Sequence, residues 1–174
     1  MNAANLIVAG ALALAVSVAA AQTTTPNDAQ IAAIVVAANQ VDIDAGKLAE
    51  SKAANKDVKA FAKRMVADHT GVNKSATALV TKLKVKPEAN PTSDSLTKGG
   101  QETLKRLTVL KGAAFDKTYV DNEVTYHQTV LDAIDKTLIP SAKNEELKAL
   151  LVKVRPAFVD HLEHAKHLQA SLGK

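Results

Sequence analysis

The chain has 174 residues and a formal charge of +4, and it contains no cysteine, no tryptophan and few other aromatic residues. This length allows one domain with a core of useful size, and the absence of cysteine excludes disulfide bonds and thiolate metal sites. Nearly all the basic charge is lysine spread along the chain, without Arg/Lys clusters or stacking aromatics, which argues against nucleic-acid binding.

The first 21 residues predict a cleavable signal peptide. An apolar run from Leu6 to Val18 is too short to cross a bilayer comfortably, and the alanines after it fit a signal-peptidase site after Ala21. We therefore expect export to the periplasm or beyond, with a linker at 22–27 before the folded domain. Because no Lys or Arg precedes the apolar run, two alternatives stay open: an upstream start codon and an uncleaved N-terminal anchor.

Four long amphipathic segments follow the linker, and each predicts a helix. Apolar residues recur at three- and four-residue steps over about 28–53, 57–84, 113–138 and 144–171. Pro140 is expected to stop the third helix and Pro156 to bend the fourth. Between the second and third helices, the turn formers in PEANPTSDSLTKGG predict an irregular segment, followed by a short helix from Gln101 to about Val109.

These segments predict an all-α fold. Short links join the first helix to the second and the third to the fourth, so each pair forms an antiparallel hairpin, and the longer connection joins the hairpins. We expect an antiparallel four-helix bundle over residues 28–172, with a short extra helix in the long connection.

Each apolar stripe carries one polar residue that should face the core: Asp42, His69, His127 and His161. With a helical rise of about 1.5 Å per residue, the two members of each hairpin differ in height by roughly 5–9 Å, so one shared level is plausible. Buried polar groups are costly unless they satisfy one another or share a ligand. A divalent cation such as zinc or copper would satisfy all four together. A shared hydrogen-bond network and partial exposure are the alternatives.

Two further residues join the predicted metal-ligand set. Glu123 precedes His127 by four positions, so it can orient the imidazole, ligate the metal or pair with a nearby lysine in solvent. His164 follows His161 by three and is an alternative or outer ligand. Asp68, next to His69, points elsewhere and is expected at the surface or in a hydrogen bond between helices.

Four stretches of the sequence are similar to a known family: GKLA at 46–49, VKAFAKRMVADHT at 58–70, AFDKTYVDNEVTYHQ at 114–128 and FVDHLEHAKHL at 158–168. They resemble DUF4142, a bacterial family of exported proteins of unknown function, over about residues 28–172. The resemblance implies a ferritin-like bundle of four long helices. It also implies an acidic position, matched by Asp42, and histidine positions matched by His69, His127 and His161.

The resemblance to ferritin-like proteins does not extend to their iron chemistry. Di-iron bundles need carboxylates from each helix and two Glu-x-x-His pairs. No histidine of this chain has a glutamate three residues before it. Ferritin-type iron oxidation is therefore not expected.

Three functions remain in competition. The leading hypothesis is a non-enzymatic envelope protein that binds one divalent metal ion, with a loose attraction to anionic envelope surfaces as an added feature. The second is a structural or stress-related envelope interaction module without metal, whose histidines are internal hydrogen-bond partners and whose protein partner the sequence does not identify. An enzyme is third: a bound cation can activate water, but no nucleophile–base arrangement, phosphate loop or zinc-protease motif is present.

Overall fold

The computed structural model describes residues 25–173, which contain helices and the links between them but no strand, so the expected all-α class is confirmed. The predicted signal peptide at 1–21 lies outside the described residues. Within 25–173, no helix combines the length and the apolar character needed to cross a membrane. The elements in chain order are α1 (Asp28–Lys52), α2 (Lys56–Lys82), α3 (Pro91–Thr108), α4 (Gly112–Ala133), the π-helix η1 (Ile134–Leu138), α5 (Ile139–Ser141) and α6 (Glu145–Leu172).

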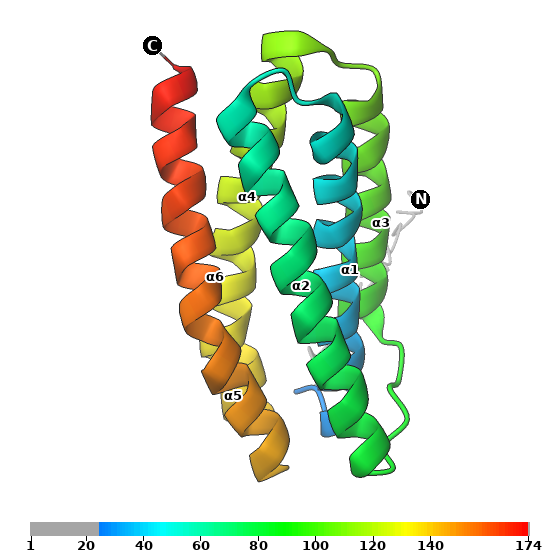
Figure 1. Ribbon diagram of the computed structural model, residues 1–174. Helices are drawn as coiled ribbons and strands as arrows, with labels where there is room; N and C mark the ends of the chain where they lie inside the picture. The colour runs from blue at the N-terminus through cyan, green and yellow to red at the C-terminus, as the bar shows by residue number, and fades with distance from the viewer. Residues whose placement is uncertain (1–24, 174) are drawn as a thin grey trace, which may run out of the picture.

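The long helices lie side by side (Figure 1). α1 packs along α2, and α4 packs along α6, as the two predicted hairpins require. Contacts of α2 with α6 and of α1 with α4 join the two pairs. α3 packs along α1, on the side away from α6 (Figure 1). The buried residues of these helices, together with Leu107 of α3, form the core.

The prediction of an irregular segment followed by a short helix is wrong, because α3 begins at Pro91 and not near Gln101. The Asn90 side chain accepts hydrogen bonds from the backbone N–H groups of residues 92–93, and the Ser93 hydroxyl accepts one from the Asn90 N–H. This capping box, with proline at the first helical position, starts the helix. The residues that suggested a loop are therefore a helix start.

Gly100 lies within α3 at a point where this helix packs closely against α1. A Cβ atom at this position would stand 2.7 Å from Val41 Cγ2, closer than real contacts allow. A glycine in mid-helix is intrinsically unfavourable by about 1 kcal/mol relative to alanine, and here its small size permits the close approach of the two helices. The same glycine that argues for a loop in sequence is thus a packing residue.

Pro140 also behaves differently from the expectation. The helical backbone does not stop at Pro140 but continues to Ser141 through η1 and α5. The π-helical turn lies immediately before this proline, where the missing N–H would break an α-helical ladder. α6 runs as one helix through Pro156.

Two aspartates connect the helix ends. Asp28, at the start of α1, accepts hydrogen bonds at 2.9 and 3.0 Å from the backbone N–H groups of residues 143–144, ahead of α6. Asp116 of α4 accepts bonds at 3.0 and 2.8 Å from the N–H groups of residues 54–55, between α1 and α2. Both satisfy donors that helix starts leave without partners. Each bond also connects one hairpin to the other, which fixes their relative height.

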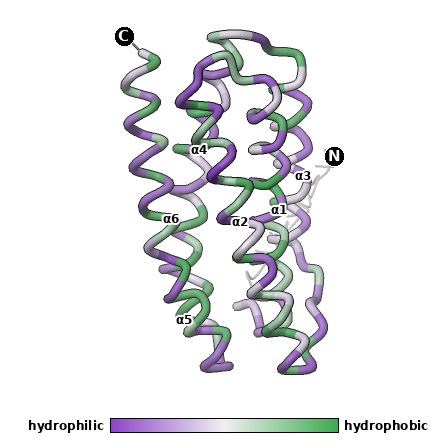
Figure 2. Tube along the Cα trace, in the orientation of Figure 1, coloured by the Kyte–Doolittle hydropathy of each residue, from purple (hydrophilic) through white to green (hydrophobic). Residues whose placement is uncertain are grey.

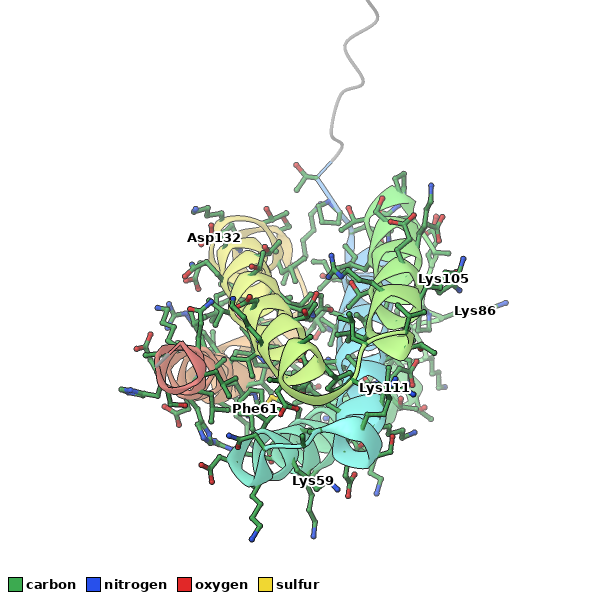
Figure 3. All side chains as sticks on the ribbon, turned by 90° about the horizontal axis from the view of Figure 1, so that it is seen from above. Lys59, Phe61, Lys86, Lys105, Lys111 and Asp132 are labelled. Atoms are coloured by element: carbon green, nitrogen blue, oxygen red, sulfur yellow. The ribbon has the colours of Figure 1, made fainter. Side chains whose placement is uncertain are left out.

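The core consists of two apolar clusters. The first contains Ile31, Leu131, Ile134, Leu151 and Phe158, and the second contains Ala49, Phe61, Met65, Phe115 and Tyr119. Figure 2 shows hydrophobic and hydrophilic residues alternating along the long helices, as one-sided burial requires. Seen from above, charged side chains such as Lys59, Lys105 and Asp132 point outward, whereas Phe61 lies among the helices (Figure 3). The lysines thus form the solvated surface.

Candidate metal centre

Five ionisable side chains meet in the interior, and each is at most 1% exposed: Asp42, His69, Glu123, His127 and His161. They come from α1, α2, α4 and α6. The structure therefore brings together five of the six residues that the sequence predicted. Ion-pair and ring contacts connect the members, so they form one cluster.

The distances within each of two overlapping groups of three residues, which share His127, suit a small cation. Asp42 Oδ2 lies 2.9 Å from His69 Nε2 and 3.4 Å from His127 Nε2. One nitrogen from each of the three histidines lies within 4.8 Å of the others, and the same limit holds for ligand atoms of Asp42, Glu123 and His127. Nitrogen and oxygen ligands at about 2.0–2.1 Å from a tetrahedral zinc ion are roughly 3.3 Å apart. Modest side-chain shifts would therefore complete a coordination sphere.

Asn39 determines which nitrogen of His69 faces the cluster. The Asn39 Nδ2 group donates to the Val35 carbonyl at 2.7 Å, which leaves Oδ1 as the atom that faces the imidazole. His69 Nδ1–H donates to this Oδ1 at 2.7 Å. In a neutral imidazole only one nitrogen carries a proton, so Nε2 of His69 presents a lone pair toward Asp42.

The other two histidines are oriented in the same way. His127 Nδ1–H donates to the backbone carbonyl of Glu123 at 3.0 Å, one helical turn earlier. His161 Nε2–H donates to the carboxylate of Asp68 at 2.9 Å, from α6 to α2. Metal-binding histidines almost always donate their second N–H to a carboxylate or carbonyl. All three imidazoles therefore have the outer hydrogen bond that a metal ligand requires.

The inward atoms have no hydrogen-bond partner among the described residues. They are His69 Nε2, His127 Nε2, His161 Nδ1, both Asp42 oxygens and Glu123 Oε2. At 2.9 Å, the Asp42 oxygen and His69 Nε2 are close enough for a hydrogen bond but lack its geometry. Since each buried polar group without a partner costs about 1–3 kcal/mol, the cluster needs a ligand, a proton or water in its centre.

The two carboxylic acids have different protonation states. Burial by itself raises the pKa of Asp42, but interactions with the His69 and His127 imidazoles, which are strongest when these rings are protonated, outweigh burial and lower this pKa to about 2. Burial, reinforced by the neighbouring Asp42 charge, raises the pKa of Glu123 well above its ordinary value. Asp42 is therefore ionised at neutral pH, whereas Glu123 releases its proton much less readily than Asp42 does.

The environment also keeps two of the histidines neutral. Burial lowers the pKa of His127 although the Asp42 charge opposes the shift. Burial lowers the pKa of His161 to about 4, against the opposing hydrogen bond to Asp68. Neutral imidazole is the form that binds metal. At neutral pH these two histidines need not lose a proton before they can ligate.

His164, the sixth predicted ligand, is not brought to the cluster. Its ring packs edge-on against Phe61, with the ring centroids 5.1 Å apart, and neither ligand group found among residues 25–173 includes it. Asp68 makes the expected hydrogen bond between helices, and its side chain remains 40% exposed.

Sequence reasoning missed the role of Asn39. Its signal was present, because a polar residue three positions before Asp42 lies on the same helical face. It also missed Phe158, whose ring centroid lies 5.0 Å from that of His69 and forms an apolar wall beside the cluster.

A family model described as a domain of unknown function (DUF4142) matches residues 13–168, so the chain belongs to this family. The resemblance expected from the four sequence stretches is therefore confirmed. No curated protein and no solved structure matches the chain. Because the family description names no activity, function must be argued from the site.

Proposed function

We propose that this DUF4142 protein is a non-enzymatic binder of one divalent metal ion. The proposed ligands are His69 Nε2, His127 Nε2, His161 Nδ1 and a carboxylate oxygen of Asp42. Glu123 is a fifth ligand once it has lost its proton. A bound ion would connect α1, α2, α4 and α6 at their common core and would polarise any water coordinated to it.

One observation carries the proposal: each histidine donates outward while its inward nitrogen lacks a partner. Core histidines that serve only as hydrogen-bond partners would use both nitrogens or leave the second in solvent. Here three lone pairs and an ionised carboxylate converge where the histidines are at most 1% exposed. A cation satisfies all of them at once, and it neutralises a carboxylate that would otherwise be a buried charge.

The donor set favours zinc or copper. Imidazole nitrogens suit both ions, and a single carboxylate oxygen is an accepted fourth ligand for zinc. Calcium and magnesium prefer sites made of oxygen ligands, which three imidazoles do not supply. The competition between zinc and copper depends on availability as well as on affinity.

We further propose that the protein works in the periplasm or elsewhere outside the cytoplasm, with residues 1–21 as its signal peptide. The lysine-rich surface supports a loose association with anionic envelope surfaces. We also infer that α1, α2, α4 and α6 are the four helices of a ferritin-like bundle, with α3 as an addition to it. Fractionation of cells that express the tagged full chain tests the location, and a cytoplasmic product of full length would contradict it.

The proposal is tested with protein purified without a His-tag. Metal analysis and calorimetric titration with zinc and with copper should give one ion per chain. His127→Ala should abolish this binding, whereas His164→Ala should retain it, because the His164 ring packs against Phe61 and belongs to neither ligand group. Failure of the wild-type protein to bind either ion at micromolar concentration refutes metal binding. A scaffold with an internal hydrogen-bond network is then the better account.

A further inference from the structure

A groove with a volume of about 370 Å³ lies between α1, α3 and α4. One wall comes from α3, including Leu96, Gly99 and Thr103, and the opposite wall comes from α4, including Asn122 and Tyr126. The groove therefore follows the boundary between the added helix α3 and the helices that hold the cluster.

Two residues of the cluster are among those that line the groove. Asp42 and Glu123 both line it, whereas none of the three histidines does. Both Asp42 oxygens and Glu123 Oε2 are without hydrogen-bond partners among the described residues. A cation that moved inward along the groove would thus meet carboxylate oxygens first and the imidazoles behind them. This order suits a hydrated ion, because oxygen ligands can replace its waters stepwise.

Beside the groove, only weak hydrogen bonds join α3 to α4. α3 packs closely along α1, where Gly100 meets Val41, but it contacts α4 at few places. Across the boundary, Thr103 Oγ1 and an Arg106 guanidinium N–H both donate to Asn122 Oδ1 at 3.4 Å, which is long for a hydrogen bond. Near the groove, α3 can therefore move away from α4 without breaking a strong hydrogen bond, whereas Leu107, buried with Phe115 and Tyr119 of α4, holds the end of α3 in place.

The opposite side of the cluster is closed. The Phe158 ring packs against His69, with the ring centroids 5.0 Å apart, and the His161–Asp68 hydrogen bond connects α6 to α2. An ion leaving in this direction would have to displace a buried aromatic ring or break the bond that orients a ligand. The groove is the less obstructed way into the cluster.

We propose that a hydrated divalent cation enters and leaves the cluster through the groove between α3 and α4, so that the protein is an exchangeable metal store. This inference rests on the proposed metal binding and goes beyond it. Structural zinc sites are closed and hold their ion as part of the fold. A site whose carboxylates line a solvent-connected groove can instead accept an ion when the concentration rises and release it to a competing ligand.

The experiment uses two exposed glycines that both lie within helices but differ in their position relative to the groove. Gly99 lies in α3 and lines the groove, and Gly71 lies in α2 away from it. A Cβ at either position would meet no described atom within 4 Å, so a larger side chain fits in both cases. Gly99→Leu should obstruct the groove, and Gly71→Leu is the matched control. Circular dichroism verifies that both variants fold.

Zinc uptake is followed by stopped-flow mixing of metal-free protein with zinc, and release by transfer of zinc to an excess of chelator. Gly99→Leu should slow both rates at least tenfold and change the Kd by less than about threefold, because an obstructed path raises the barrier in both directions. Gly71→Leu should leave both rates unchanged. Wild-type rates in Gly99→Leu, or zinc that no chelator removes from the folded wild-type protein, overturn the inference while metal binding stands. Absence of zinc binding in all three proteins refutes the proposed function itself, and the inference with it.

Discussion

Asn39 of α1 accepts a hydrogen bond from Nδ1 of His69 on α2, at 2.7 Å, and is itself held by the Val35 carbonyl one turn earlier. If the Asn39 amide group rotated so that its oxygen and nitrogen atoms exchanged places, both hydrogen bonds would be lost. A residue that contacts no metal in the proposed site therefore determines which histidine nitrogen is free to bind one.

Replacing Asn39 should weaken metal binding without removing it. Loss of an outer hydrogen-bond partner typically lowers metal affinity by about 10- to 100-fold, so Asn39→Ala should raise the Kd by that factor and keep one ion per chain. Titration calorimetry measures both quantities. Asn73→Ala is the control, because Asn73 also crosses from α2 to α1, donating to the Val36 carbonyl at 3.4 Å, but orients no histidine. Equal losses in the two variants would show that Asn39 acts only through packing.

Asp68, which is partly exposed, should orient His161 in the way that Asn39 orients His69. Asp68→Ala removes the acceptor for the Nε2–H group and should weaken metal binding about tenfold, whereas Asp68→Asn retains an acceptor oxygen and should weaken it less. Because this side chain is 40% exposed, the free energy of unfolding should change by no more than about 1 kcal/mol. Asp132→Ala, which removes an exposed acid paired with Lys136, is the control. Identical affinities for Asp68→Ala and the wild type would remove Asp68 from the site.

The long helices were predictable because their apolar residues repeat with the helical period. The predicted segments 28–53 and 57–84 differ from α1 and α2 only at their ends. α3 was not predictable in the same way, since Asn, Pro, Ser and Gly also signal turns. Its start depends on a capping box at Asn90, and its continuation depends on contact with Val41 of another helix.

The candidate site was likewise predictable from the sequence only in part. The positions of Asp42, His69, His127 and His161 on apolar stripes were sufficient to expect that they face one core. The burial of Glu123 and the exclusion of His164 were not settled, because a four- or three-residue spacing indicates a shared helix face without giving the rotation of that helix. The neighbouring helices set that rotation, and the apolar period of a single helix carries no information about them.

Glu123→Gln should raise the stability of the metal-free protein at pH 7. Burial and the charge of Asp42 keep the folded-state pKa of Glu123 well above 4.5, so the unfolded chain releases this proton more readily. Stability is therefore lost as the pH rises above 4.5, and a neutral glutamine avoids the loss. Urea denaturation between pH 5 and 8 should show a difference that grows with pH, whereas Glu102→Gln, on the exposed surface of α3, should behave like the wild type. A constant difference across this range would contradict a raised pKa for Glu123.

Acid should destabilise the metal-free protein through its histidines. The pKa of His161 is lowered by burial from 6.5 to about 4, so the unfolded chain binds a proton before the folded chain does. Stability should fall as the pH decreases from 6.5 to about 4, and the lowered pKa of His127 acts in the same direction. Measurement in the Glu123→Gln background removes the opposing contribution of that residue. The slope should be smaller when His161→Gln is added, and an unchanged slope would exclude His161 as its source.

Gly46 belongs to the GKLA stretch and should tolerate no side chain. A Cβ here would stand 2.9 Å from Val66 Cγ2 and 3.1 Å from the backbone oxygen of Ala62, so α1 and α2 would have to separate. Such overpacking typically costs about 1–3 kcal/mol, and Gly46→Ala should reduce the free energy of unfolding by this amount. Gly71→Ala adds the same methyl group to a helix where it meets no described atom, and it should stabilise the protein by about 0.5–1 kcal/mol. Urea denaturation of the two metal-free variants should therefore give shifts of opposite sign. If Gly46→Ala were stabilising as well, helix propensity would outweigh the contact, and close packing of α1 on α2 would not explain the glycine.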